Sequence, residues 1–304
     1  MKNIIVTGGK GFIGKPLVRL LRNHNVVKIW DIKNGIDILK RLPSPDRDYD
    51  VIIHLAAELE ILLSRPIKEL DLNLRATVRL LEWARRHDVE KFVFASSAAV
   101  YGEAEKRPTP EDASLKPFWS YGSSKLASEI YIQQYEELYG IKTVMLRPAI
   151  VTGVGEWYGR FVTLSLARIR QNKPILVFDS GYQTRDFIDV LDTAYAFYLA
   201  SIKNVPTPLI LNVGSGREVR IKDVANFLSK MAGNHPIKYV SPKVGELGRK
   251  PHELQHLCLD IKRAKKYLGW KPTISLKDTL KSEYKWVMSM SEREFRKWIR
   301  KPRY

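Results

Sequence analysis

The stretch Ile4-Ile-Val-Thr-Gly-Gly-Lys-Gly-Phe-Ile-Gly14 decides the fold. Its apolar, β-branched start runs into three glycines spaced three apart, at Gly8, Gly11 and Gly14, and an apolar-periodic segment follows over residues 12–21. This order predicts a strand, a tight turn and a helix whose N-terminal N–H groups can approach a pyrophosphate. Three glycines also make an ordinary turn, but the strand before them and the helix after them are the context that a dinucleotide-binding loop requires.

A carboxylate follows this loop at the expected distance. The short apolar run Val26–Trp30 ends at Asp31, about twenty residues after the glycines, where such sites place the acid that binds the adenosine ribose hydroxyls. A carboxylate there repels a 2′-phosphate, which favours NAD over NADP. The alternative is an aspartate that caps a turn or helix.

Asp37 and Ile38 are expected beside the adenine, and the small residues Ala56 and Ala57 after the next apolar run are expected to let the backbone approach the cofactor.

Composition limits the class of protein. The chain has 304 residues, 44% of them apolar, which is enough for one large domain or two closely joined ones. No apolar run approaches the roughly 18 residues of a membrane span, so no membrane partner is expected. Cys258 is the single cysteine, which excludes an intrachain disulfide and a cysteine-rich metal site. Because an apolar strand pattern starts at Asn3, we expect no signal peptide and a cytoplasmic location.

The formal net charge of +18 raises the question of a nucleic-acid partner. The basic residues are spread along the chain, with a denser tail over residues 293–303. Spread charge is typical of a solvated surface or of a protein with an anionic substrate, so a nucleic-acid partner is not favoured.

Strand and helix patterns alternate regularly up to residue 148 and irregularly beyond it. Apolar runs predict strands at 51–55 and 92–95, and helical spacing predicts helices at 66–86 and 120–139. After residue 148, helices are expected at 161–171, 190–201, 221–231, 264–270 and 276–288, and strands at 175–178, 209–213 and 237–240. The tail, with Phe295, Trp298 and Ile299, is expected to pack back as a helix. This order predicts an α/β protein.

Two polar motifs suit the chemistry of a bound dinucleotide. Ser96 and Ser97 follow a strand, and the carboxyl ends of parallel strands are where α/β sheets bind ligands. Tyr121 and Lys125 are four residues apart, so they share one face of the predicted helix. A nearby ammonium favours the phenolate, so we expect Lys125 to lower the pKa of Tyr121. The alternative is two surface side chains, a spacing that is frequent by chance.

With these motifs the chain resembles the extended short-chain dehydrogenases, within the NAD-dependent sugar epimerase/dehydratase group. The resemblance runs almost end to end and is carried by Val6-Thr-Gly-Gly-x-Gly-Phe-Ile-Gly14, His54-Leu-Ala-Ala57, Ser96-Ser97, Val100-Tyr-Gly102, Tyr121-x-x-x-Lys125, Gln183-Thr-Arg-Asp-Phe187, Asn212-Val-Gly-Ser-Gly216 and Lys266-Tyr-Leu-Gly-Trp270.

The resemblance implies an architecture. A Rossmann-type, doubly wound parallel sheet would hold NAD, formed by residues 1–148 with part of 182–213. A smaller C-terminal α+β lobe, formed by residues 149–181 and 214–304, would bind the nucleotide sugar. A homodimer is implied through the helices around residues 70–86 and 121–139.

The resemblance also implies roles for single residues. Ser97, Tyr121 and Lys125 would be catalytic, with Tyr121 as the base for the sugar hydroxyl. The substrate would meet Ser97, Ala98, Tyr121, Arg185 and Lys250, the last two at its diphosphate, although Arg185 could instead pair with Asp186 and Arg249 could take the place of Lys250. The cofactor would meet Gly8, Gly11, Phe12, Ile13, Gly14, Asp31, Asp37, Ile38, Leu55, Ala56, Ala57, Asn73, Ser96, Tyr121, Lys125 and Pro148.

One dipeptide separates the reactions of this group. Dehydratases carry an acid pair, typically Asp-Glu, directly after the catalytic hydroxyl, whereas this chain has Ala98 and Ala99. The resemblance is therefore greatest to UDP-glucose 4-epimerases, which oxidise and reduce the sugar reversibly with bound NAD. Ile150 stands where an asparagine is common, and Glu58 follows the His54 motif where a lysine is common. The alternatives are a nucleotide-sugar reductase or decarboxylase, and a cofactor-binding scaffold on nucleic acid.

Overall fold

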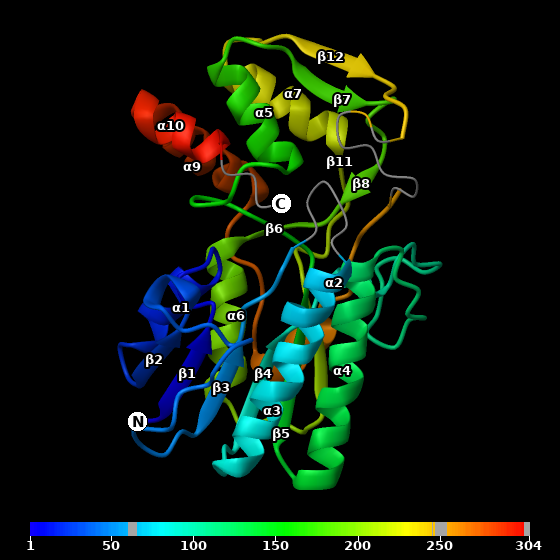
Figure 1. Ribbon diagram of the computed structural model, residues 1–304. Coiled ribbons are helices and arrows are strands. Elements are labelled where there is room, and N and C mark those ends of the chain that lie inside the picture. The colour runs from blue at the N-terminus through cyan, green and yellow to red at the C-terminus, as the bar shows by residue number, and fades with distance from the viewer. Residues whose placement is uncertain (60–65, 245, 247–253, 301–304) are drawn as a thin grey trace.

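The computed structural model describes residues 1–59, 66–244, 246 and 254–300 (Figure 1). A parallel sheet of six strands forms its larger part, in the order β10-β5-β4-β3-β1-β2. The strand bounds are β1 (Asn3–Thr7), β2 (Val26–Trp30), β3 (Val51–His54), β4 (Lys91–Ala95), β5 (Lys142–Pro148) and β10 (Leu209–Val213). This order, in which the chain moves outward from β1 in both directions, is that of a Rossmann-type sheet, as the family resemblance implied.

Helices cover both faces of this sheet because successive strand residues point to opposite sides. Ile4 and Val6 face one cluster, which contains α1 (Gly14–Leu21) and α6 (Val190–Ile202). Ile5 faces the other cluster, which contains α3 (Ala76–Arg86) and α4 (Ser120–Tyr139). The predicted helix 66–86 is formed by α2 (Pro66–Glu69), a π-helical turn over Leu70–Arg75 and α3, in unbroken succession.

A smaller group of elements lies beyond the carboxyl ends of the strands (Figure 1). It contains α5 (Phe161–Arg170), the parallel pair β7 (Ile175–Phe178) and β12 (Ile237–Val240), α7 (Ile221–Met231), α9 (Leu276–Ser289) and α10 (Glu292–Ile299). Their apolar side chains form a separate core that includes Phe295, so the tail packs back as a helix, as expected. Two short pairs join the groups: β6 (Ile150–Thr152) with β9 (Phe187–Asp189), and β8 (Thr184–Arg185) with β11 (Val219–Arg220).

One element differs from the expected division of the chain. Helix α8 (Lys262–Leu268) was placed in the smaller lobe, but Ala264, Leu268 and Trp270 are fully buried in the core between α6 and the large sheet. The Trp270 indole nitrogen donates a hydrogen bond to the Asp192 carbonyl at 2.9 Å, which fixes this segment on α6.

Within the described ranges, no helix is long and apolar enough to cross a membrane.

Candidate active site

A cavity of about 1180 Å³ opens at the carboxyl ends of the parallel strands and extends under the smaller lobe. Among described residues that the sequence assigned to cofactor or substrate, all except Asn73 line it. They come from the glycine loop, the ends of β2 to β5, the start of α4 and β8. A volume this large can hold a dinucleotide together with a second nucleotide.

The glycine loop at the start of α1 leaves its backbone bare toward this cavity. Gly8 has a φ of +67°, and a Cβ there would meet the Ala56 backbone nitrogen at 2.8 Å. The Gly11 nitrogen donates to the Gly8 carbonyl at 2.8 Å, and a Cβ on Gly11 would come within 2.9 Å of that carbonyl oxygen. Only glycine fits both positions, so the loop has the cradle that a pyrophosphate requires at a helix N-terminus. These residues therefore fit NAD.

Asp31 lies at the end of β2 on the wall of the same cavity. Its carboxylate accepts backbone hydrogen bonds from Lys10 of the glycine loop and from Lys33, both at 2.9 Å. Asp31 caps the short turn Ile32–Asn34, so the capping role that the sequence left open does occur. The cap also holds the carboxylate against the glycine loop, where the adenosine ribose is expected.

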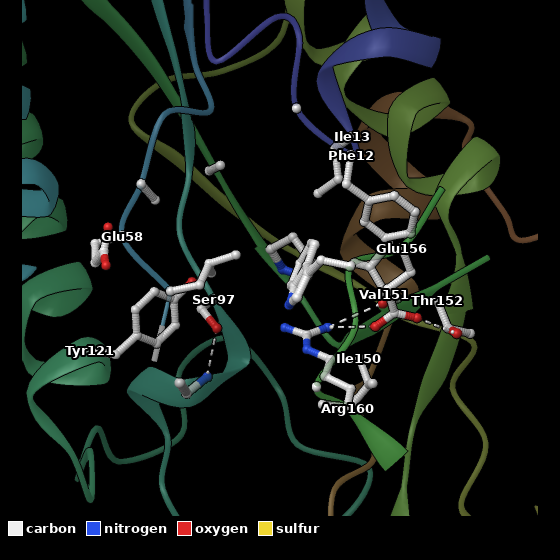
Figure 2. Close-up of a pocket in the computed structure, with 18 of the residues that line it drawn as sticks. Phe12, Ile13, Glu58, Ser97, Tyr121, Ile150, Val151, Thr152, Glu156 and Arg160 are labelled. Atoms are coloured by element: carbon white, nitrogen blue, oxygen red, sulfur yellow. Dashed lines mark hydrogen bonds and ion pairs between the residues drawn. The ribbon is translucent and has the colours of Figure 1, made fainter. Parts of the chain in front are cut away.

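Ser97, Tyr121 and Lys125 all line the cavity. Figure 2 shows Ser97 and Tyr121 on the same side of it. The Ser97 hydroxyl accepts a hydrogen bond from the Ala99 nitrogen at 3.1 Å, because Ser97 caps the turn Ala98–Val100. Lys125 lies one turn after Tyr121 on α4 and is 1% exposed. Its Nζ donates to the Ala95 carbonyl at 2.8 Å and lies 5.9 Å from the centre of the Tyr121 ring. The spacing of four residues therefore brings both side chains into one site.

The electrostatics of this pair differ from the expectation. Burial raises the pKa of Tyr121, and a hydrogen bond with Ser97 and the charge of Arg160 oppose that effect. Burial also lowers the pKa of Lys125 to about 7, against the opposing charge of Glu129. The expected effect of Lys125 on the Tyr121 hydroxyl does not prevail, because burial disfavours the charged form of each group.

A buried network holds the strand end that carries Ser97. The Ser96 hydroxyl donates to Glu129, and Arg147 donates to both oxygens of Glu129, at 2.9 and 2.6 Å. Glu129 and Arg147 are each 1% exposed, and Arg147 also donates to the Tyr101 hydroxyl at 2.9 Å. The Ser96 hydroxyl is therefore already hydrogen-bonded to Glu129. Ser96 still lines the cavity, so its expected contact with the cofactor would use its other atoms.

Two polar residues near the site, Asn73 and His54, make buried hydrogen bonds to other protein groups. Asn73 is fully buried and does not line the cavity; its amide donates to the Glu58 carbonyl at 3.1 Å and to the Ser124 hydroxyl at 3.0 Å. It therefore joins α4 to the loop after β3, and the predicted contact of Asn73 with the cofactor has no support in this geometry. His54 lies between the hydroxyls of Thr7 and Thr77, at 2.7 and 3.0 Å, and burial keeps its pKa well below the usual value.

Only some of the residues predicted to bind the substrate lie within the described part of the chain. Arg185 lines the cavity from β8, where its Nη1 donates to the Thr184 carbonyl at 2.8 Å. The Asp186 carboxylate accepts hydrogen bonds from the nitrogens of Ser215 and Leu259 at 2.7 and 3.1 Å. Ala98 and Ala99 line the cavity directly after Ser97. Lys250 and its neighbour Arg249 lie outside the described residues.

A cluster that no sequence pattern predicted lies on the wall opposite Ser97 and Tyr121. Glu156, Trp157 and Arg160 line the cavity there, in the segment before and at the start of α5 (Figure 2). The Trp157 ring meets Phe12 of the glycine loop edge-on, at 5.5 Å between ring centres. The segment has no repeat or spacing that marks a site, and only its richness in glycine and aromatic residues could have drawn attention to it.

Comparison with known proteins agrees with this geometry. The sequence model of the NAD-dependent epimerase/dehydratase family matches residues 4–214, more than half of the chain. A protein of Methanocaldococcus jannaschii named "Putative UDP-glucose 4-epimerase" is 34% identical, over 93% of this chain and 98% of that protein.

Solved structures show the same likeness. UDP-glucose 4-epimerase from Thermotoga maritima, solved with UDP-glucose, has a TM-score of 0.81 at 27% identity, over 93% of this chain and 98% of that one. UDP-glucuronic acid 4-epimerase from Bacillus cereus, solved with UDP-glucuronic acid and NAD, has a TM-score of 0.83 at 27% identity, over the same shares of the two chains. With the matching glycine loop and the paired Tyr121 and Lys125, these likenesses show that the chain belongs to the NAD-dependent epimerase/dehydratase family and that its cofactor is NAD.

Proposed function

We propose that the chain is a UDP-sugar 4-epimerase that interconverts UDP-glucose and UDP-galactose. The observation that carries the proposal is the strand end after β4, where Ser97 faces Tyr121 while Ala98 and Ala99 follow it on the cavity wall. A dehydratase needs acid and base groups to remove water, and two methyl groups supply neither. The names of the similar proteins support an epimerase acting on a UDP-sugar.

In the proposed reaction each residue of the site has a separate role. NAD, held by the glycine loop and Asp31, would supply reversible hydride transfer at carbon 4 of the sugar. Tyr121 removes the proton from the O4 hydroxyl and later gives it back. Ser97 donates a hydrogen bond to that oxygen and steers the proton. Such positioned proton transfer typically contributes about 10²–10⁴-fold in rate.

The phenolate that this role requires depends on positive charge near the Tyr121 hydroxyl. Burial alone would keep Tyr121 protonated, so the site needs positive charge near its hydroxyl. Lys125 lies beside the Tyr121 ring, and Arg160 already acts to lower the pKa of Tyr121. The oxidised ring of NAD would add a further positive charge near Tyr121 and so favour its phenolate.

The test is interconversion of the two sugars by purified protein without added NAD. We expect UDP-galactose and UDP-glucose to reach the same mixture from either side, measured by chromatography, with no net change in nicotinamide absorbance. Protein that holds NAD and leaves both compounds unchanged would contradict the assignment. Net change in absorbance, or release of CO₂ from a sugar acid, would favour a reductase or a decarboxylase instead.

The chain also has a surface that suits a homodimer. Ile130, Tyr131, Leu138 and Tyr139 on α4 are exposed, as is Leu70 at the start of the helical stretch beside it. These residues lie on the helices through which the family resemblance implied that two copies of the chain would pair. Light scattering after gel filtration should give twice the mass of the chain, and a mass of one chain at micromolar concentration would contradict a dimer.

A further inference from the structure

A short segment between β6 and α5 packs against the glycine loop. Residues 153–159, the cover segment, are bounded by Gly153 and Gly159, whose φ angles are +138° and +135°. A backbone with such angles at both ends is not held by the hydrogen-bond ladder of a helix or sheet. Side-chain contacts therefore decide where the cover segment lies.

The cover segment touches the glycine loop at Phe12. The Trp157 ring meets the Phe12 ring edge-on, and a Cβ built on Gly155 would lie 4.0 Å from the same ring. The Arg160 guanidinium lies over the Trp157 ring, 4.8 Å from its centre. Figure 2 shows Phe12 on the same side of the cavity as Glu156 and Arg160. Phe12 and Trp157 both line the cavity, so the position of the cover segment sets the access to the expected pyrophosphate site.

Glu156 anchors the cover segment to the smaller lobe. Its backbone carbonyl accepts a hydrogen bond from the indole nitrogen of Trp298 on α10 at 2.9 Å. The Thr152 hydroxyl lies 2.8 Å from Oε2 of Glu156 and 2.9 Å from Oε2 of Glu283 on α9. A hydroxyl has one hydrogen and can donate to only one of these oxygens, so the other contact requires a protonated carboxyl. The side-chain anchor is therefore complete only while the two glutamates hold a proton.

The surroundings of this pair disfavour two negative charges. Glu156 is 1% exposed, Glu283 is fully buried, and neither Oε1 atom has a hydrogen-bond partner among the described residues. Nη1 of Arg160, at the start of α5, lies 3.8 Å from Oε1 of Glu156, beyond hydrogen-bond distance. Asp189, at the end of β9, adds a negative charge beside Glu283, and Asp192 of α6 acts on Asp189 in the same sense. Burial raises the pKa of Glu156 to about 7 and that of Glu283 well above its usual value, so near neutral pH the pair keeps at least one proton.

We propose that Glu156 and Glu283 are positioning residues whose shared proton holds the cover segment against the glycine loop and so slows the release of bound NAD. When that proton is lost, two like charges repel each other in a place shielded from water, and the anchor of the cover segment to α9 weakens. Trp157 then leaves Phe12 more often. The inference goes beyond the proposed function, because it concerns retention of the cofactor and holds whichever sugar reacts.

The direction of the pH effect follows from the protons that each arrangement binds. When the cover segment opens, the two carboxyl groups reach water, where a glutamate has a pKa of about 4.3. Above about pH 5 the closed arrangement therefore holds more protons than the open one, and each pH unit favours opening by about tenfold for every proton released. Release of NAD through the open arrangement should become faster as the pH rises.

The experiment measures how fast radiolabelled NAD leaves the loaded protein during a chase with excess unlabelled NAD. For wild type, the rate should rise by about tenfold or more between about pH 6.5 and pH 8.5. Glu283→Gln, and the double variant that adds Glu156→Gln, should keep release slow and lose most of that rise, because an amide donates a hydrogen bond without becoming charged. Trp157→Ala should release NAD faster at every pH.

Glu111→Gln is the matched control. Glu111 is also a buried carboxyl group with a pKa raised by burial, but it does not line the cavity, so its replacement should leave the wild-type profile unchanged. Lys125 is present in every variant, so the pH dependence that it contributes is a common background. Circular dichroism shows that the compared proteins are folded.

Four outcomes would overturn the inference. A wild-type rate that does not vary with pH would show that no proton controls release, and a rise that persists in both glutamine variants would assign the control to other groups such as Lys125. Fast release at every pH in the glutamine variants would show that the pair serves packing alone. Unchanged release in Trp157→Ala would show that the cover segment does not retain the cofactor. Because no sugar enters this assay, a failure to interconvert sugars would contradict the proposed function and leave this inference standing.

Discussion

Lys125 couples the chemistry of the site to the stability of the fold, and replacing it tests that coupling. Its ammonium is 1% exposed, and burial lowers its pKa from 10.5 to about 7. A lysine in the unfolded chain keeps its proton up to about pH 10.5. Between about pH 7 and pH 10.5 the unfolded state therefore binds more protons, so the free energy of unfolding rises with pH over that window.

The size of the effect follows from the same values. Each pH unit in the window is worth about 1.4 kcal/mol, so the charged lysine destabilises the fold by at most about 5 kcal/mol at or below about pH 7. Lys125→Met removes that cost and loses the hydrogen bond to the Ala95 carbonyl, worth about 1 kcal/mol. We expect the variant to be more stable than wild type by about 2–4 kcal/mol near pH 6 and to lose most of its activity.

The assay is urea unfolding from about pH 6 to pH 9, with the two proteins matched for NAD content. The advantage of Lys125→Met should shrink by about 3 kcal/mol between about pH 7 and pH 9. Lys91→Met is the matched control: Lys91 is 3% exposed, has a pKa lowered to about 8 and donates to the Lys203 carbonyl at 2.6 Å, away from the cavity lining. It should show a smaller gain with turnover intact. A stability difference that does not vary with pH would refute the reasoning.

Three further substitutions test the site and its support. Tyr121→Phe should lower turnover by about 10²–10⁴-fold while keeping the fold and the bound NAD, as judged by circular dichroism and released nicotinamide; full activity would show that another group is the base. Asp31→Ala should shift the ratio of dissociation constants for NAD and NADP by about tenfold toward NADP, and an unchanged ratio would remove Asp31 from the ribose site. Arg147→Met leaves Glu129 buried without its partner and should cost about 3–5 kcal/mol in urea unfolding, with part regained in the double variant that adds Glu129→Gln; wild-type stability would contradict the network seen here.

Local patterns in the sequence were sufficient to predict the strands and helices of the part of the fold that contains the six-stranded sheet. Each strand of the six-stranded sheet is a short apolar run that ends in small or polar residues, and the helices between them have apolar residues at helical spacing. Glycines spaced three apart after the first strand predicted the bare loop, because a Cβ at Gly8 or Gly11 would overlap backbone atoms. The spacing of four residues put Tyr121 and Lys125 on one helix face for the same local reason.

Contacts between distant segments decided what local patterns could not. The helical pattern around Asn73 does not show which way its side chain points. In the structure its amide donates to Ser124 on α4, and Asn73 does not line the cavity. Helix α8 lies between segments of the smaller lobe in the sequence, yet its apolar side chains Ala264 and Leu268 pack in the core beside α6. Arg160 and Glu156 became part of the site only when β6 and the start of α5 folded over the strand ends.

The sequence by itself determined the glycine loop, the positions of the main strands and the pairing of Tyr121 with Lys125, because each depends on side chains within a few positions of one another. Only the tertiary structure decided the charge states, since burial sets the pKa of Tyr121, Lys125 and Glu156, and burial depends on what segments far along the chain cover.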